Sequence, residues 1–157
     1  MLNEKILVLR EQLIEMSALA QEMIEHSIRG LLNKDQDLLR EIIDRKEPKV
    51  NLLEVELDEL ATNLIALHEP KARDLRMILM VMRINNDLER IGDHAVNIAE
   101  SGLYLIERPP VKPLVDIPRM AELAVGMLQD ALNAFIHHAV DSVRSAASHA
   151  DNLDACI

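Results

Sequence analysis

The sequence predicts an all-α protein built from long, amphipathic, antiparallel helices. Three observations lead to this prediction: hydrophobic residues make up 49% of the 157-residue chain, aromatic residues make up only 1%, and four Gly and six Pro leave few turns. Sheets favour aromatic residues, whereas apolar residues at alternating spacings of three and four indicate the buried face of a helix. A chain of this length can form one domain with a sizeable core.

The first predicted helix covers residues 3–32. Its apolar face is formed by Ile6, Leu9, Leu13, Met16, Ala20 and Met23. A short polar turn follows, in which Asp35 is a candidate N-cap for the next helix.

The second predicted helix covers residues 35–67 and contains Pro48. Proline lacks an amide donor and its ring clashes with the preceding turn, so we expect the helix to kink or restart there. The apolar face after the proline consists of Val50, Leu53, Leu57, Leu60, Leu64 and Leu67. Pro70 marks its end, because the residue before a proline avoids the α conformation.

The third predicted helix is the longest and covers residues 71–107. One apolar face is formed by Met77, Val81, Ile84, Leu88, Ile91, Ala95, Ile98, Gly102 and Leu105. Glycine inside a helix costs about 1 kcal/mol relative to alanine, so Gly92 needs a packing reason. We expect Ile91 and Ala95 to lie in the tightest part of the core, and another backbone or a ligand to approach Gly92.

Prolines at positions 109, 110 and 113 indicate a linker, and a further helix is predicted over residues 116–138. An Ala- and Ser-rich helical segment should follow from about Asp141. The predicted organisation is thus a three-helix unit at 1–107, a linker at 108–115 and a shorter unit at 116–157.

An internal repeat supports this division. Shifting the chain by 104 residues aligns Met16, Leu19, Ala20, Met23, Ile28, Leu32, Asp37 and Arg40 with Met120, Leu123, Ala124, Met127, Leu132, Ile136, Asp141 and Arg144. Part of the match is amphipathic pattern that any two helices share. If the repeat is real, the second copy is incomplete, and its apolar helix must either pack on the first unit or pair with a second copy of the chain.

Composition narrows the functional classes. A net charge of −10 and the scarcity of aromatic side chains argue against binding to nucleic acids. The single cysteine, Cys156, excludes an intrachain disulfide and fits a reducing compartment. Charged residues interrupt the first helix, unlike the apolar core of a signal peptide, so we expect a cytoplasmic protein.

The third predicted helix has an acidic stripe that suggests either a cation site or a solvated surface. The stripe consists of Asn86, Glu89, Asp93, Asn97 and Glu100. Glu89 and Asp93 are like charges one turn apart, which costs about 0.2–0.5 kcal/mol in an isolated helix. Neighbouring arginines at 76, 83 and 90 could neutralise the stripe. Alternatively, carboxylate and amide oxygens suit a hard cation such as iron, manganese, magnesium or calcium.

The second helix has a companion stripe formed by Glu47, Asn51, Glu54 and Asp58. If the two helices lie antiparallel, both stripes approach one surface. The resulting candidate metal site comprises Glu89, Asp93 and Asn97, assisted by Asn51 or Glu54. A solvated face remains the alternative for either stripe.

Three sequence segments resemble the PhoU family of phosphate-uptake regulators. They are Pro-Lys-Ala-Arg-Asp-Leu-Arg at 70–76, the stretch 86–100 with its Glu-Arg-Ile-Gly-Asp core, and Lys-Glu-Pro-Lys-Val-Asn at 46–51 with Glu54. The resemblance covers residues 5–107 and implies a PhoU-like antiparallel three-helix bundle, followed here by the first helices of a second, incomplete repeat.

The resemblance also implies a function. PhoU proteins are non-catalytic regulators that restrain phosphate uptake and signalling through a phosphate ABC transporter and a sensor histidine kinase. They meet the membrane only through such partners. Several bind iron, or another metal such as manganese or magnesium, through a motif that corresponds here to Glu89 and Asp93. Two features depart from the family: Glu47 precedes a proline, and residues 113–157 lack the metal motif of a second repeat.

Three functions remain open on this basis. The first is a metal-binding adaptor of phosphate regulation that forms a homodimer. The second is a metal-dependent enzyme on a helical bundle, in which carboxylates position a metal-bound water. The third is a helical interaction module with a solvated acidic face. A closed pocket beside Glu89 and Asp93 would favour the enzyme, and an open face would favour the adaptor.

Overall fold

The computed structural model describes residues 2–110, 112–137, 147–150 and 152, and all the regular secondary structure in them is helical. Its elements are α1 (Leu2–Asn33), α2 (Gln36–Glu41), the π-helical segment η1 (Ile42–Lys46), α3 (Glu47–His68), α4 (Ala72–Ile106) and α5 (Asp116–His137). This confirms the predicted all-α class. Of the segment predicted from Asp141, residues 147–150 are helical. The rest of it, apart from residue 152 but including Cys156, lies outside the described residues.

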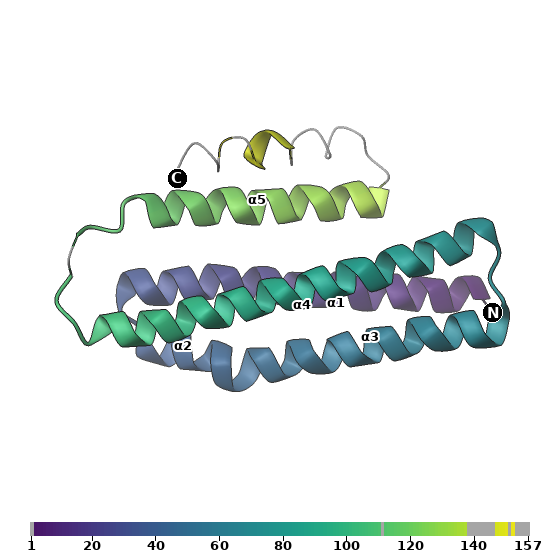
Figure 1. The fold of residues 1–157 in the computed structure, drawn as a ribbon, viewed down its shortest axis with the longest axis horizontal. Helices are drawn as coiled ribbons and strands as arrows, with labels where there is room; N and C mark the ends of the chain where they lie inside the picture. The colour runs from purple at the N-terminus through teal and green to yellow at the C-terminus, as the bar shows by residue number, and fades with distance from the viewer. Residues whose placement is uncertain (1, 111, 138–146, 151, 153–157) are drawn as a thin grey trace.

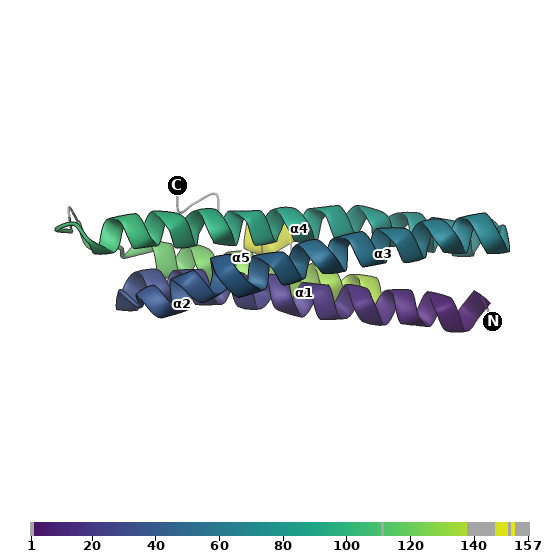
Figure 2. The ribbon, with the colours of Figure 1, turned by 90° about the horizontal axis from the view of Figure 1, so that it is seen from below.

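The helices form three layers. α1 and α4 run side by side in the middle, α3 packs antiparallel to them on one side, and α5 lies on the other side (Figure 1). Figure 2 shows α3 along the α1–α4 pair, with α5 behind them.

The core lies between α1, α3 and α4, as the apolar faces predicted. Its buried members include Leu9, Leu13, Met16, Ala20, Met23, Val50, Leu53, Leu57, Leu64, Val81, Leu88 and Ala95. Ala95 is fully buried, whereas Ile91 packs at the edge of the core. Two assignments were wrong: Leu67 is 72% exposed and Leu105 is 48% exposed. Both lie in the last turn of their helices, where the bundle opens to solvent.

The break predicted at Pro48 takes the form of the π-helical segment. The amide of Glu47 donates to the carbonyl of Ile42, five residues earlier. In an ordinary α-helix the ring of Pro48 would press on the carbonyl of Asp44 and leave it unbonded. A wider turn just before the proline relieves this conflict.

The N-cap predicted at the start of the second helix is confirmed: Asp35 accepts a hydrogen bond from the amide of Leu38 at 3.0 Å.

Two glycines make room for the side chain of Leu39, which joins α2 to α1 and α4. Leu39 is fully buried. A Cβ atom on Gly30 would lie 2.6 Å from Leu39 Cδ2, and one on Gly102 would lie 2.9 Å from Leu39 Cδ1. Both separations are below van der Waals contact, so any larger residue would displace Leu39.

Gly92 allows α3 to approach α4. A Cβ atom on Gly92 would lie 3.3 Å from Val50 Cγ1 and 3.7 Å from Met23 Cε. The close neighbour expected at this glycine is therefore a pair of side chains, in place of the backbone or ligand that the sequence suggested.

Helix α5 packs along α1 as an added helix, one of the two arrangements expected from its apolar face. Arg10 of α1 donates to the carbonyl of Ile136 at 3.0 Å, and the neighbouring Phe135 is buried. Closer to the linker, α5 stands off from the bundle. A cavity of about 540 Å³ lies there between α1, α4 and α5, and another of about 450 Å³ lies beside it.

The fit between Gly30 and Leu39 gives a first prediction. Gly30→Ala should destabilise the protein by up to about 2 kcal/mol, because overpacking costs more than the gain in helix propensity. In a Leu39→Ala background, itself less stable by about 2–5 kcal/mol, the same change should instead stabilise by up to about 1 kcal/mol. Urea denaturation of the four proteins measures this coupling. An equal effect of Gly30→Ala in both backgrounds would show that the close contact is unimportant.

Candidate functional site

A buried amide joins α3 to α4 at the base of the acidic surface. Asn85 of α4 is 1% exposed, and its Nδ2 donates to the backbone carbonyl of Glu54 in α3 at 2.9 Å. Its Oδ1 atom is buried without a hydrogen-bond partner among the described residues. Asn85 was not predicted from the sequence, although it lies four residues after Val81 and three before Leu88, which is core spacing.

Three carboxyl groups converge on the surface next to this contact. The pKa of Glu89, one turn after Asn85, is raised above its ordinary value. Burial is the largest cause, followed by the charges of Asp93 and Glu54; Arg90 acts in the opposite direction. A hydrogen bond to Asp93 that protonated Glu89 can form is the smallest of the causes that raise its pKa. The packing of α3 against α4 thus brings Glu54 close enough to influence the pair predicted on α4.

The arginines expected to neutralise the stripe do not pair with it. Among the described residues, no ion pair joins Arg76, Arg83 or Arg90 to the carboxylates of Glu89 or Asp93. The salt-bridged surface considered as the alternative is therefore absent here. The negative charge of the cluster is left to solvent or to a bound cation.

The remaining predicted ligands lie further from the cluster. Asn51 and Asn97 are both exposed. Asn97, one turn after Asp93, also lines the 540 Å³ cavity that faces α5. Glu89 is half-buried and Asp93 is exposed at the surface, and neither residue lines the cavities described beside α5. Such a surface position favours an adaptor over an enzyme, which would need a pocket that excludes water.

The donor set limits which cation fits. Within the described part of the chain, no group of three or more His, Cys, Asp or Glu side chains is placed to hold a metal ion. A closed site with all ligands from the protein is thus not preformed. Hard cations that retain several water ligands need only one or two carboxylates. Glu89 and Asp93 fit such a partly hydrated ion.

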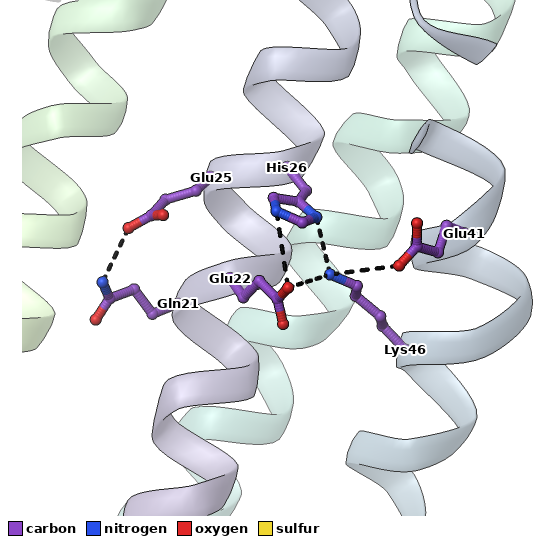
Figure 3. A network of polar contacts seen from close by, with 6 residues as sticks. All are labelled: Gln21, Glu22, Glu25, His26, Glu41 and Lys46. Atoms are coloured by element: carbon purple, nitrogen blue, oxygen red, sulfur yellow. Dashed lines mark hydrogen bonds and ion pairs between the residues drawn. The ribbon is translucent and has the colours of Figure 1, made fainter. Parts of the chain in front are cut away.

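A second titratable cluster joins η1 to α1 (Figure 3). Lys46, only 8% exposed, places its Nζ 2.8 Å from Glu22 Oε1 and 2.8 Å from His26 Nδ1, with Glu41 at 3.8 Å. The hydrogen bond from Lys46 is the largest cause of the lowered pKa of Glu22. Burial and then the charge of Lys46 lower the pKa of His26, which keeps its ring neutral and able to accept.

This cluster was not foreseen from the sequence, where Lys46 belonged only to the family motif. Its buried lysine is held by Glu22 and His26 at 2.8 Å each. Its contribution is to tie the last residue of the π-helical segment to α1, directly before the acidic stripe of α3 begins.

No helix in the described part of the chain is long and apolar enough to cross a membrane.

Comparison with known proteins places the chain in a family. The family model described as the PhoU domain matches residues 13–102. The phosphate-specific transport system accessory protein PhoU homolog of Aquifex aeolicus is 37% identical over 145 residues, covering 92% of this chain and 65% of that protein. The accessory protein PhoU of Escherichia coli is 30% identical over 139 residues, covering 88% and 57% respectively.

Solved structures agree. The crystal structure of PhoU from Pseudomonas aeruginosa superposes with a TM-score of 0.93 at 26% identity, covering 99% of this chain and 75% of that one. The crystal structure of the phosphate transport system regulatory protein PhoU from Streptococcus pneumoniae superposes with a TM-score of 0.89 at 27% identity, covering 99% of this chain and 73% of that one.

These names describe accessory and regulatory proteins rather than enzymes. The chain spans between about half and two thirds of the length of the Aquifex and Escherichia relatives, 65% and 57%. The matched region includes α1 from Leu13 onward, the acidic stripe of α3 and most of α4 up to Gly102. The chain belongs to the PhoU family.

Proposed function

We propose that this protein is a non-catalytic regulator of phosphate transport that binds a metal ion and acts as an adaptor in the cytoplasm. Its partners would be a phosphate ABC transporter and a sensor histidine kinase. The observation that supports the metal site most directly is the mutual influence of Glu54, Glu89 and Asp93 at the surface, where no arginine forms an ion pair with Glu89 or Asp93 among the described residues. The names of the relatives support the link to phosphate transport.

Glu89 and Asp93 would hold the ion, with Glu54 beside them. Iron is the first candidate, and manganese or magnesium are alternatives, since all three accept carboxylate oxygens. Asn51 and Asn97 would contribute at most through coordinated water, because both lie one turn from the carboxylates and are exposed. A bound cation would relieve the repulsion that raises the pKa of Glu89.

The metal site gives a second prediction. Adding Mn²⁺, Mg²⁺ or Fe³⁺ should raise the melting temperature of the wild type, because a ligand of the folded state stabilises it. Glu89→Gln/Asp93→Asn should abolish this rise. Without metal at pH 7, Glu89→Gln alone should be more stable than the wild type by about 0.2–0.5 kcal/mol, since it removes a like-charge pair.

The raised pKa of Glu89 determines how the gain in stability from Glu89→Gln depends on pH. The raised pKa means that the folded state holds the Glu89 proton more tightly than the unfolded state, whose value is near 4.5. Ionised Glu89 thus destabilises the fold at neutral pH, and this penalty disappears below pH 4.5. Glu56→Gln/Glu59→Gln, on the exposed face of α3, is the matched control. Equal stabilisation by metal in all variants would refute the site.

The regulatory role gives a third prediction. In bacteria that lack their own PhoU-type protein, this chain should restore repression of a phosphate-starvation reporter at high phosphate. The Glu89→Gln/Asp93→Asn variant should lose repression at equal protein level, and the Glu56→Gln/Glu59→Gln control should keep it. Failure of the wild-type chain to repress would contradict the proposal for this chain. Full repression by the metal-site variant would separate regulation from metal binding.

We also propose that the protein forms a homodimer. Large apolar side chains that the described helices do not cover remain exposed in α1 and before α5, namely Leu7, Val8, Ile14, Leu114 and Val115. Covering such surface stabilises by about 25 cal/mol per Å². Sedimentation equilibrium should give twice the monomer mass of 17.7 kDa. A single 17.7 kDa species at micromolar concentration would contradict the dimer.

A further inference from the structure

We propose that Asn85 is a positioning residue for the cation site: its hydrogen bond to the Glu54 carbonyl fixes the axial position of α3 on α4 and thereby places Glu54 beside Glu89. This inference rests on the proposed metal site and names a residue that governs it. Asn85 belongs to neither of the predicted polar stripes and is hidden from solvent.

Asn85 is a poor choice of residue for stability alone. It is a buried amide with one satisfied donor and an unpartnered Oδ1 in an otherwise apolar interface. Apolar residues of similar volume are often neutral or stabilising in such places, whereas a single buried asparagine can fix the alignment of packed helices. The orphaned oxygen therefore points to a role in alignment.

The position of Asn85 along the helices suits this role. Two contacts between α3 and α4 lie on either side of the Glu54–Glu89 pair: Asn85 with the Glu54 carbonyl, and Gly92 with Val50. Glu89 lies one helical turn after Asn85, and Glu54 one turn after Val50. Only the Asn85 contact is directional, because apolar contacts slide readily and a hydrogen bond does not.

A slip between the two helices would separate the carboxylates. If α3 shifted along α4 by one turn, the carboxylate of Glu54 would move by about 5.4 Å relative to Glu89. That displacement is larger than the separation over which a single ion can bridge two oxygens, at about 2.0–2.6 Å from each. Alignment of the two helices is thus a condition for Glu54 to add its charge to a cation held by Glu89 and Asp93, and Asn85 is the polar group that supplies this alignment.

The test compares stability with cation affinity. Asn85→Leu should unfold at the same or a higher urea concentration than the wild type, while its Mn²⁺ affinity, measured by titration calorimetry, falls about 10- to 100-fold, as for the loss of other groups that orient ligands. If Asn85→Leu does not fold because leucine does not fit, Asn85→Ala takes its place and should show the same loss of affinity. Ser27→Ala, which removes a buried hydroxyl bonded within α1, is the control and should keep wild-type affinity.

A second readout needs no metal. In a Cys156→Ser background, Val50→Cys and Gly92→Cys should form a disulfide, because a Cβ atom on residue 92 would lie 3.3 Å from Val50 Cγ1. If alignment is lost, adding Asn85→Leu should slow the formation of this disulfide by oxidised glutathione.

The outcomes separate the positioning role from the metal site. Wild-type Mn²⁺ affinity in both Asn85 variants, or an unchanged rate of disulfide formation in Asn85→Leu, overturns the positioning role. If the wild type itself binds no cation, the metal site fails and with it the role of Asn85 in cation binding; the disulfide rate then tests only the alignment of α3 on α4, which slower formation supports and an equal rate rejects.

Discussion

The packing of α3 against α4 is the constraint on which the candidate site depends. Each helix presents an acidic stripe that alone would be ordinary solvated surface. The absence of a side chain at Gly92 admits Val50, and the amide of Asn85 holds the Glu54 carbonyl at 2.9 Å. These two contacts bring Glu54 close enough to raise the pKa of Glu89 together with Asp93. Tertiary packing thus adds the charge of Glu54 to the Glu89–Asp93 pair that α4 presents by itself.

The orientation of α3 is set before the acidic stripe begins. Pro48 cannot continue a regular helix, and the π-helical segment provides the wider turn that accommodates it. Lys46 at the end of that segment is bonded to Glu22 and His26 of α1, while Leu39 fills the space left by glycines in α1 and α4. The polar contacts of Lys46 with α1 and the apolar contacts of Leu39 with α1 and α4 therefore hold the α2–α3 connection in place. A rigid connection of this kind suits a surface whose carboxylates must keep a defined spacing.

Much of the fold could be predicted from spacing alone, because three- and four-residue repeats of apolar side chains determine which helix faces are buried. The exceptions have physical reasons. Leu67 and Leu105 continue the pattern past the point where a partner helix is present. Lys46 and Asn85 are polar residues in buried positions, and their partners, in α1 and α3 respectively, become visible only when the helices are packed. Glu89 and Asp93 are adjacent candidates in the sequence because they lie one turn apart on α4, whereas the cavity that Asn97 lines beside α5 could not be inferred from periodicity.

If the α3–α4 interface creates a cation site, anomalous diffraction from crystals grown with Mn²⁺ shows it most directly. We expect a manganese peak within coordinating distance of both the Glu89 and Asp93 carboxylates, with Glu54 adjacent and water completing the shell. Repetition with Glu89→Gln/Asp93→Asn crystals should remove the peak. A peak located elsewhere on the protein, or an ordered acidic face without manganese at saturating concentration, would contradict a cation site at this interface.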